Sequence, residues 1–144
     1  MADIRFQYFS VAVRDLDEGI ERYGKYFGLK PVGEVKDQRW GFKGVMLGTD
    51  EGAILELISP VAEDSALKRF MDMREGEAYP RGEGLYLVGL QVDDLDARVQ
   101  QVEGAGGRVT REAESPNLGW VHPLSNGNVM VEFIARPAPE GTDA

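Results

Sequence analysis

The sequence contains no cysteine and only one histidine, His122, among its 144 residues. Without cysteine the chain has no disulfide, no thiol nucleophile and no cysteine-ligated zinc site. A single histidine removes most of the chemistry that depends on imidazole pairs or clusters. Candidate catalytic residues must therefore be sought mainly among the other polar side chains.

Basic residues and long apolar segments are also scarce. Sixteen Lys and Arg stand against twenty-five Asp and Glu, a net charge of −9 that repels nucleic acid and anionic membrane surfaces. No apolar run approaches the length of about eighteen residues that spans a membrane, and the start "MADIRF" does not resemble a signal peptide. We therefore expect a cytoplasmic protein with no nucleic-acid or membrane partner.

One sequence pattern occurs twice. "VAVRDLDEGIERY" at 11–23 returns as "LQVDDLDARVQQV" at 90–102. Alternating apolar residues predict a strand before each copy, and Asp15 and Asp94 are suited to cap the helix that follows. Gly28 is expected to end the first helix, and Gly106 with the next glycine the second. Each half thus begins with a strand and a helix.

Further strands follow in both halves. "GVMLGT" and "GAILELIS" flank a glycine-containing turn, and "GWVHP" and "NVMVEFIA" flank "LSNG", which is typical of hairpins. A short helix capped at Asp64 or Ser65, followed by the loop "GEAYPRGEG", connects the halves. We predict an α+β fold of one domain over residues 1–135, with two βαβββ units at about 6–60 and 84–135 and a flexible tail at 136–144.

Paired βαβββ units that open with a strand and "VRDLDE" resemble the vicinal oxygen chelate superfamily, which includes glyoxalase I, extradiol dioxygenases and bleomycin-resistance proteins. The resemblance covers roughly residues 6–135. "ILELISPVAEDSALKRF", "GLYLVGLQVDDLDA" and "VHPLSNGNVMVEF" are most similar to the methylmalonyl-CoA epimerase branch. The resemblance implies a curled, mostly antiparallel sheet around a central cup that holds the ligand, and it implies a homodimer.

The resemblance also implies four metal-ligand positions, which fall on Tyr8, Glu56, Leu87 and Glu132. The family usually has histidine where Tyr8 and Leu87 stand. A neutral phenol is a poor ligand for a divalent ion, and leucine is not a ligand. We therefore predict no metal and no other cofactor, and we keep a metal-dependent epimerase or lyase as an alternative.

Two glutamates, Glu56 and Glu132, are the candidate catalytic residues. Simple alternation would direct both toward solvent, since leucines flank Glu56 and Val131 and Phe133 flank Glu132. Both glutamates, however, share their strand faces with apolar residues at matching places in the two halves, which favours a common ligand cup. Desolvation would then raise the pKa of at least one of them, so that one carboxylate could act as base and the other as acid.

Seven further residues are candidate ligand contacts, and each has an ordinary structural alternative. Tyr8 and Leu87 could simply fill a vacated metal site, aromatic residues could pack within the sheet, and a lone histidine beside a turn is often structural. The predicted substrate-binding residues are Tyr8, Leu87, Trp40, Phe42, Trp120, His122 and Met130.

Three functions remain open. The protein could sequester a compound without reaction, as bleomycin-resistance proteins do; it could be an isomerase or lyase that uses Glu56 and Glu132; or it could be a dimeric scaffold with a filled cup. We favour a metal-free small-molecule-binding protein of this superfamily, with enzymatic activity left open. An acidic ligand would need a cation, and the sequence pattern singles out none among Arg39, Lys43, Arg69 and Arg81.

Overall fold

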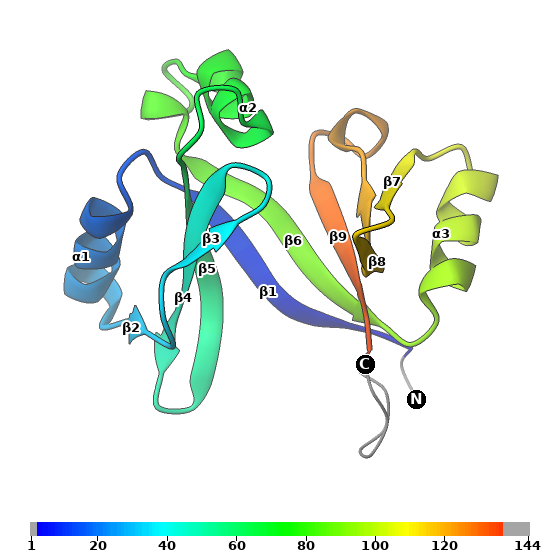
Figure 1. Ribbon diagram of the computed structural model, residues 1–144, viewed down its shortest axis with the longest axis horizontal. Coiled ribbons are helices and arrows are strands. Elements are labelled where there is room, and N and C mark those ends of the chain that lie inside the picture. The colour runs from blue at the N-terminus through cyan, green and yellow to red at the C-terminus, as the bar shows by residue number, and fades with distance from the viewer. Residues whose placement is uncertain (1–2, 137–144) are drawn as a thin grey trace. The chain divides into compact units, whose positions relative to one another are not determined.

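The computed structural model describes residues 3–136, which form two compact units (Figure 1). The N-terminal unit is Tyr8–Tyr86, and the C-terminal unit combines Met1–Gln7 with Leu87–Ala144. The boundary passes through strands β1 (Ile4–Ala12) and β6 (Gly84–Val92). The predicted flexible tail lies outside the described residues, apart from Arg136.

Four strands of the N-terminal unit run in the spatial order β2-β4-β5-β1. They comprise β2 (Lys30–Pro31), β4 (Phe42–Thr49), β5 (Gly52–Pro60) and the later part of β1. A fifth strand, β3 (Lys36–Gln38), also pairs with β4. β1 and β5 are parallel, whereas β4 is antiparallel to β5, β2 and β3. The chain is therefore an α+β protein with mixed strand pairing.

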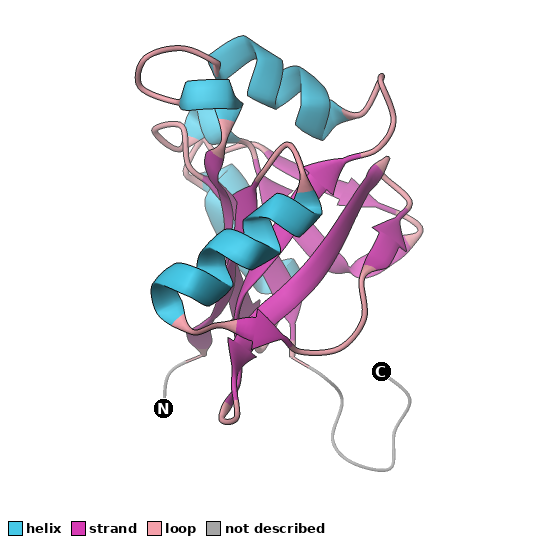
Figure 2. Ribbon diagram, turned by 90° about the vertical axis from the view of Figure 1, so that its left-hand side faces the viewer, coloured by secondary structure: helices cyan, strands magenta, loops and turns pink. Residues whose placement is uncertain are grey.

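Helix α1 (Leu16–Phe27) lies across the strands of the N-terminal unit (Figure 2). The Asp15 carboxylate accepts a hydrogen bond from the Glu18 backbone N–H, and Gly28 adopts a left-handed conformation after the last turn. The buried side of α1 packs on a cluster from alternate positions of β1, β4 and β5, which includes Val11, Val45, Leu47, Leu55 and Leu57. The other face of these strands carries the candidate site.

Helix α2 (Ala66–Arg74) and the 3₁₀ turn η1 (Pro80–Gly82) connect the two halves of the sequence. Asp64 and Ser65 were the two predicted caps of α2. Ser65 is the cap, because its Oγ accepts a hydrogen bond from the Lys68 N–H. Arg14 holds this segment near the end of β1, since its Nε donates to the Arg81 carbonyl and its guanidinium pairs with Asp72 at 2.9 Å. The connection is thus an ordered part of the N-terminal unit.

The C-terminal unit repeats the plan with the strand order β6-β9-β8-β7. After β6 come α3 (Leu95–Gly104), β7 (Val109–Glu112), β8 (Ser115–Val121), the 3₁₀ turn η2 (Pro123–Ser125) and β9 (Met130–Ala135). Asp94 caps α3 by accepting from the Ala97 N–H. A cluster that includes Val92, Leu95, Val99, Val121 and Phe133 joins α3 to one face of the strands.

The predicted order of strand, helix and further strands is confirmed in both halves, but the N-terminal half has four strands after its helix where three were predicted. Helix α3 ends at Gly104, before the predicted glycine stop, because Ala105 already closes the helix with backbone hydrogen bonds. The connection predicted as a loop contains η1, and the predicted hairpin turn after β8 contains η2. No helix within residues 3–136 is long and apolar enough to cross a membrane.

Candidate functional site

Glu56 lies in the middle of β5, between two paired strands. It is in register with Ser10 on the parallel strand β1 and with Met46 on the antiparallel strand β4. Its neighbours Leu55 and Leu57 face the core under α1, so Glu56 belongs to the opposite face. The residue is half-buried. The predicted alternation, with Leu55 and Leu57 toward the core and Glu56 on the other face, is present, and the role of Glu56 in a ligand site stays a prediction.

The Glu56 carboxylate is held by a hydroxyl and has a glycine beneath it. Ser10 Oγ, which is buried, donates to Glu56 Oε1 at 2.8 Å. A Cβ placed on Gly44 of β4 would lie 3.1 Å from Glu56 Oε2 and 3.2 Å from Ile58 Cγ2. The missing side chain at Gly44 leaves the space in which the second carboxylate oxygen lies.

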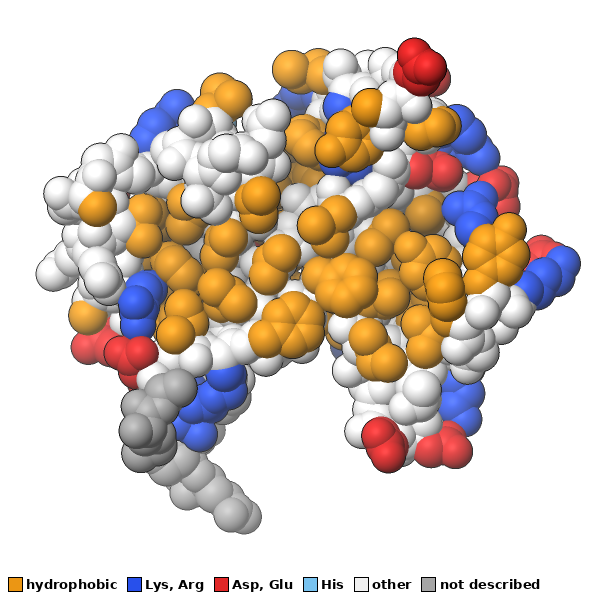
Figure 3. Space-filling view, turned by 180° about the vertical axis from the view of Figure 1, so that it is seen from behind, with side chains coloured by type: hydrophobic (Ala, Val, Ile, Leu, Met, Phe, Trp, Pro, Cys, Tyr) orange, Lys and Arg blue, Asp and Glu red, His pale blue; other side chains and the backbone are white. Residues whose placement is uncertain are grey.

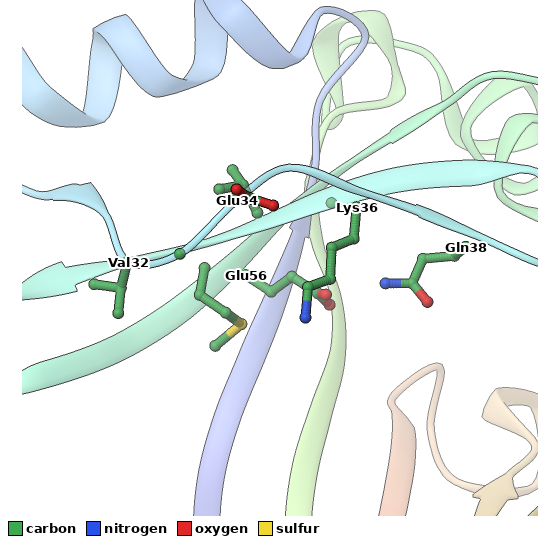
Figure 4. A pocket seen from close by; sticks show the side chains of 9 residues that line it. Val32, Glu34, Lys36, Gln38 and Glu56 are labelled. Carbon is green, nitrogen blue, oxygen red and sulfur yellow. The ribbon is translucent and has the colours of Figure 1, made fainter.

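Glu56 lines a pocket of about 320 Å³ in the N-terminal unit (Figure 4). This volume lies within the range of small-molecule sites. The pocket arises where the chain between β2 and β3 leaves the edge of β4, after the Val32 N–H donates to the Met46 carbonyl and before Lys36 pairs with Gly44. The lining residues are Val32, Gly33, Glu34, Lys36, Gln38, Gly44, Val45, Met46 and Glu56.

Three polar pocket residues, Glu34, Lys36 and Gln38, were not predicted from the sequence, and two of them, Lys36 and Gln38, belong to a strand. Both stand on β3, and Figure 4 shows them extending to the same side of this segment as Glu56, while Glu34 stands apart. Their spacing of two residues in "KDQ" is the only sequence signal, since it puts both on one face of a strand. A three-residue strand is too short for alternation to identify it.

Glu132 occupies the matching central position of β9 in the C-terminal unit. It is 7% exposed, and the indole Nε1 of Trp120 donates to its Oε2 at 2.8 Å. Leu87 pairs with Met130 and Gly89 with Glu132 between β6 and β9, so the predicted residues Leu87, Met130, Trp120 and Glu132 share one face of this unit. Each unit therefore holds one glutamate on the face away from its helix.

The sequence also matches a known family. Residues 7–122 match the model of the glyoxalase/bleomycin resistance protein/dioxygenase superfamily. The chain belongs to this superfamily. A curated relative, a probable lactoylglutathione lyase from Vibrio cholerae, is 25% identical over 140 residues, which cover 95% of this chain and 86% of the relative.

Solved structures have a similar fold. Methylmalonyl-CoA epimerase from Mycobacterium tuberculosis has a TM-score of 0.73 and 28% identity, with 94% of this chain and 89% of the epimerase covered. A hypothetical protein from Bacillus halodurans C-125 has a TM-score of 0.78 and 22% identity, with 98% and 100% covered. The predicted resemblance to the superfamily and to its epimerases is confirmed.

The other predicted contact residues have structural partners within their own units. Trp40 and Phe42 stack with ring centroids 5.9 Å apart, and Phe42 packs against the cluster that includes Ile58 and Met71. The His122 Nδ1 accepts a hydrogen bond from the Leu124 N–H at the start of η2. Neither the aromatic pair nor His122 lines the pocket of the N-terminal unit, and their contact with a ligand stays a prediction.

The residues at the superfamily's ligand positions do not fit a metal centre of that kind. Leu87 offers only hydrocarbon and is buried beside Met130. Tyr8 stands on β1 two residues before Ser10, where a neutral phenol is a weak donor. Within residues 3–136 there is no group of three His, Cys, Asp or Glu side chains placed to hold an ion. We therefore derive no chemical step through a metal.

Proposed function

We propose that this protein binds a small carbonyl compound in the pocket of the N-terminal unit and that Glu56 transfers a proton at the carbon beside the carbonyl. The observation that carries the proposal is the placement of the Glu56 carboxylate, which lines the pocket and is oriented by the buried Ser10 hydroxyl. A carboxylate that accepts a hydrogen bond from a buried hydroxyl and lines a small cavity is suited to general acid–base chemistry.

The proposed reaction is an isomerisation, or a lyase reaction that begins in the same way. Glu56 accepts the proton from the carbon, and the electron pair of the broken C–H bond moves onto the carbonyl oxygen to give an enolate. Return of the proton to the carbon, on the same or the opposite face, restores the carbonyl group. The step is balanced without an oxidant, a reductant or a metal ion.

The relatives support this substrate type. The names methylmalonyl-CoA epimerase and lactoylglutathione lyase both denote small acyl groups carried as thioesters, in which a C–H bond lies next to a carbonyl. One epimerase structure with 23% identity holds methylmalonyl-CoA itself. These facts describe the relatives, and they motivate the choice of compounds for this chain.

Glu132 is proposed as the second acid–base residue. The basis is its equivalent position in the sequence repeat and its burial with a donor, Trp120, on the neighbouring strand. Under this proposal Glu132→Gln, which keeps the shape and removes the charge, abolishes turnover, whereas Tyr8→Phe has a smaller effect.

Hydrogen–deuterium exchange in D₂O tests the enzymatic proposal without knowledge of the product. Methylmalonyl-CoA, S-lactoylglutathione and small 2-hydroxy and 2-oxo acids are incubated with the protein, and deuterium at the carbon beside the carbonyl is followed by NMR. We expect catalysed exchange with at least one compound, lost in Glu56→Gln by a factor of about 10²–10⁴. Glu51→Gln, in the exposed turn between β4 and β5, is the charge-matched control.

The same experiment separates the alternative functions. Binding of a compound without catalysed exchange would overturn the acid–base role and leave a sequestering protein like the bleomycin-resistance members. Exchange that disappears on chelation and returns with added metal would support the metal-dependent alternative. A filled scaffold is already disfavoured by the pocket of about 320 Å³.

A homodimer is proposed for the assembly. Figure 3 shows hydrophobic side chains at the surface of each unit, and Phe6 and Leu85, one in each unit, are 59% and 48% exposed. Apolar surface of this kind is typical of faces that another chain covers. Sedimentation equilibrium should give twice the 15.9 kDa chain mass. A single-chain mass at micromolar concentration would exclude the dimer.

A further inference from the structure

The turn between β8 and β9 contains an asparagine followed by a glycine, Asn126 and Gly127, which the proposed function does not use. We propose that Asn126 is a site of spontaneous deamidation, in which the backbone nitrogen of Gly127 attacks the side-chain amide and the asparagine becomes aspartate or isoaspartate. The modification lies in the C-terminal unit and requires no ligand, so it is independent of the proposed function.

The reaction is balanced with water as its only co-reactant. The Gly127 nitrogen forms a bond to Asn126 Cγ, and the Cγ–Nδ2 bond breaks. Ammonia leaves with the proton from the Gly127 N–H, which gives a cyclic imide. Water then opens the imide at either carbonyl. Cleavage of the bond to Cγ restores the ordinary main chain and gives aspartate, whereas cleavage at the backbone carbonyl gives isoaspartate.

The conformation of the turn leaves the attacking nitrogen accessible. The Val129 N–H donates to the Asn126 carbonyl at 3.1 Å, and φ is +60° at Gly127 and +68° at Asn128. Two consecutive left-handed residues are typical of a type I′ turn. Gly127 is exposed, and no hydrogen bond from its N–H is found within residues 3–136. The nucleophile of the proposed reaction therefore does not have to break a hydrogen bond.

Glycine at position 127 also hinders the attack least. It has no Cβ to crowd the approaching side chain of Asn126, and no atom lies within 4 Å of the place that a Cβ on Gly127 would occupy. The other two asparagines of the chain, Asn117 and Asn128, are followed by leucine and valine, whose side chains obstruct the same attack. Deamidation is therefore expected at Asn126 and not at the other two.

One contact of the side chain slows the reaction. Asn126 Nδ2 donates to the Val129 carbonyl at 3.0 Å, which holds the amide in its present orientation. This bond is exposed to solvent, and Asn126 and Val129 are both exposed residues. Turns with exposed hydrogen bonds open locally at a small free-energy cost. We therefore expect deamidation in the folded protein, at a lower rate than in the unfolded chain.

The two products differ in their effect on the turn. Each adds a negative charge to a chain whose net charge is −9, but only isoaspartate lengthens the main chain, by one carbon. The Asn126 N–H donates to the Pro123 carbonyl at 3.0 Å, while the Asn126 carbonyl accepts from Val129, directly before β9. A longer main chain displaces this carbonyl from its partner. Isoaspartate should therefore loosen the start of β9, and aspartate should keep the turn.

Mass spectrometry of the full-length protein tests the site. The protein is incubated folded at mildly alkaline pH, which favours loss of the proton from the attacking nitrogen, and a sample taken before incubation corrects for deamidation during digestion. Fragmentation of the peptides assigns each asparagine. We expect the mass gain of deamidation at Asn126 and loss of this product in Asn126→Ser. In Gly127→Ala the rate should fall to that of Asn117 and Asn128.

Two results would overturn the inference. No gain at Asn126 in the folded protein, under conditions that deamidate the urea-unfolded chain, would show that the turn protects the amide. Equal rates at Asn117 and Asn126, or a rate unchanged in Gly127→Ala, would remove the role of Gly127. Circular dichroism confirms that the variants are folded. For the effect on β9, the purified isoaspartate form should melt below the parent and Asn126→Asp level with it, and equal melting of all three would contradict that effect.

Discussion

The hydrogen bond between Trp120 and Glu132 gives the sharpest prediction about stability. Glu132 is 7% exposed, and the Trp120 Nε1 lies 2.8 Å from its Oε2. Trp120→Phe removes this donor from a buried carboxylate. A hydrogen bond to a charged group contributes about 1.5–3 kcal/mol to the free energy of unfolding, and one between neutral groups about 0.5–1.5 kcal/mol. The smaller ring also loses packing, so a single substitution does not isolate the bond.

A double-mutant cycle with Glu132→Gln isolates it. The amide oxygen of glutamine still accepts from Trp120, but as a neutral acceptor, so Trp120→Phe should cost about 1 kcal/mol less in the glutamine background than in the parent. Glu132→Gln alone should leave the stability unchanged or raise it by about 1 kcal/mol, because burial of an amide is less costly than burial of a carboxylate.

Urea unfolding followed by far-UV circular dichroism measures all four proteins without dependence on tryptophan fluorescence. The slope of the unfolding free energy against urea should stay constant across the cycle. A coupling energy below about 0.3 kcal/mol, which is within the additivity error of independent sites, would show that the indole and the carboxylate do not interact in solution. In that case Glu132 would lose its support as a held acid–base residue.

Three further predictions concern metal, pH and backbone geometry. Dialysis against EDTA should leave catalysed exchange and the melting temperature unchanged, and elemental analysis should find well below one metal ion per chain; one firmly bound ion would contradict this. Lys68, through its hydrogen bond, holds the pKa of Asp72 below its ordinary value. The ionised Asp72 therefore stabilises the fold above its unfolded-state pKa, and this stabilisation is lost as the pH falls through the folded-state pKa of Asp72. The melting temperature of Asp72→Asn should be below that of the parent at neutral pH and equal to it in strong acid. An equal difference at the two pH values would refute the pairing. Gly82→Ala should cost roughly 2–5 kcal/mol, because φ is +71° and the new Cβ would lie 2.2 Å from the Met71 carbonyl oxygen. Gly33→Ala, with φ of +91° and no atom within 4 Å of the new Cβ, should cost only about 1–2 kcal/mol in the same unfolding assay.

Much of the fold could be predicted because its signals are local and occur twice. The Asp15 and Asp94 caps, the apolar alternation before them and the left-handed Gly28 each depend on a few neighbouring residues. Because the pattern occurs twice, the strand and helix predicted in one half could be compared with those predicted in the other. The face on which Glu56 lies also follows from alternation, since Leu55 and Leu57 on either side of it face the core.

The pocket could not be predicted, because it depends on contacts between separate strands. The hydroxyl that orients Glu56 belongs to Ser10, forty-six residues earlier in the chain. The space for the carboxylate comes from Gly44, whose sequence context resembles that of any strand glycine. Lys36 stands in a strand of three residues, where no periodic pattern can develop. Of these three residues, none has a local property that distinguishes it from an ordinary surface or sheet residue.

The two repeats differ in the strands that pair along the edges of β4 and β8. The C-terminal unit has one strand, β7, paired along the edge of β8, whereas the N-terminal unit has two short strands, β2 and β3, on β4. The intervening chain leaves β4 and opens the pocket that Lys36 and Glu56 line. The donors to the glutamates differ as well, because Ser10 lies on the parallel strand beside Glu56 and Trp120 on the antiparallel strand beside Glu132. Each repeat carries one of the two candidate glutamates, and the chain between β2 and β3 opens the pocket beside Glu56 and not beside Glu132. We therefore expect substitutions in the 32–38 segment to change which ligand binds.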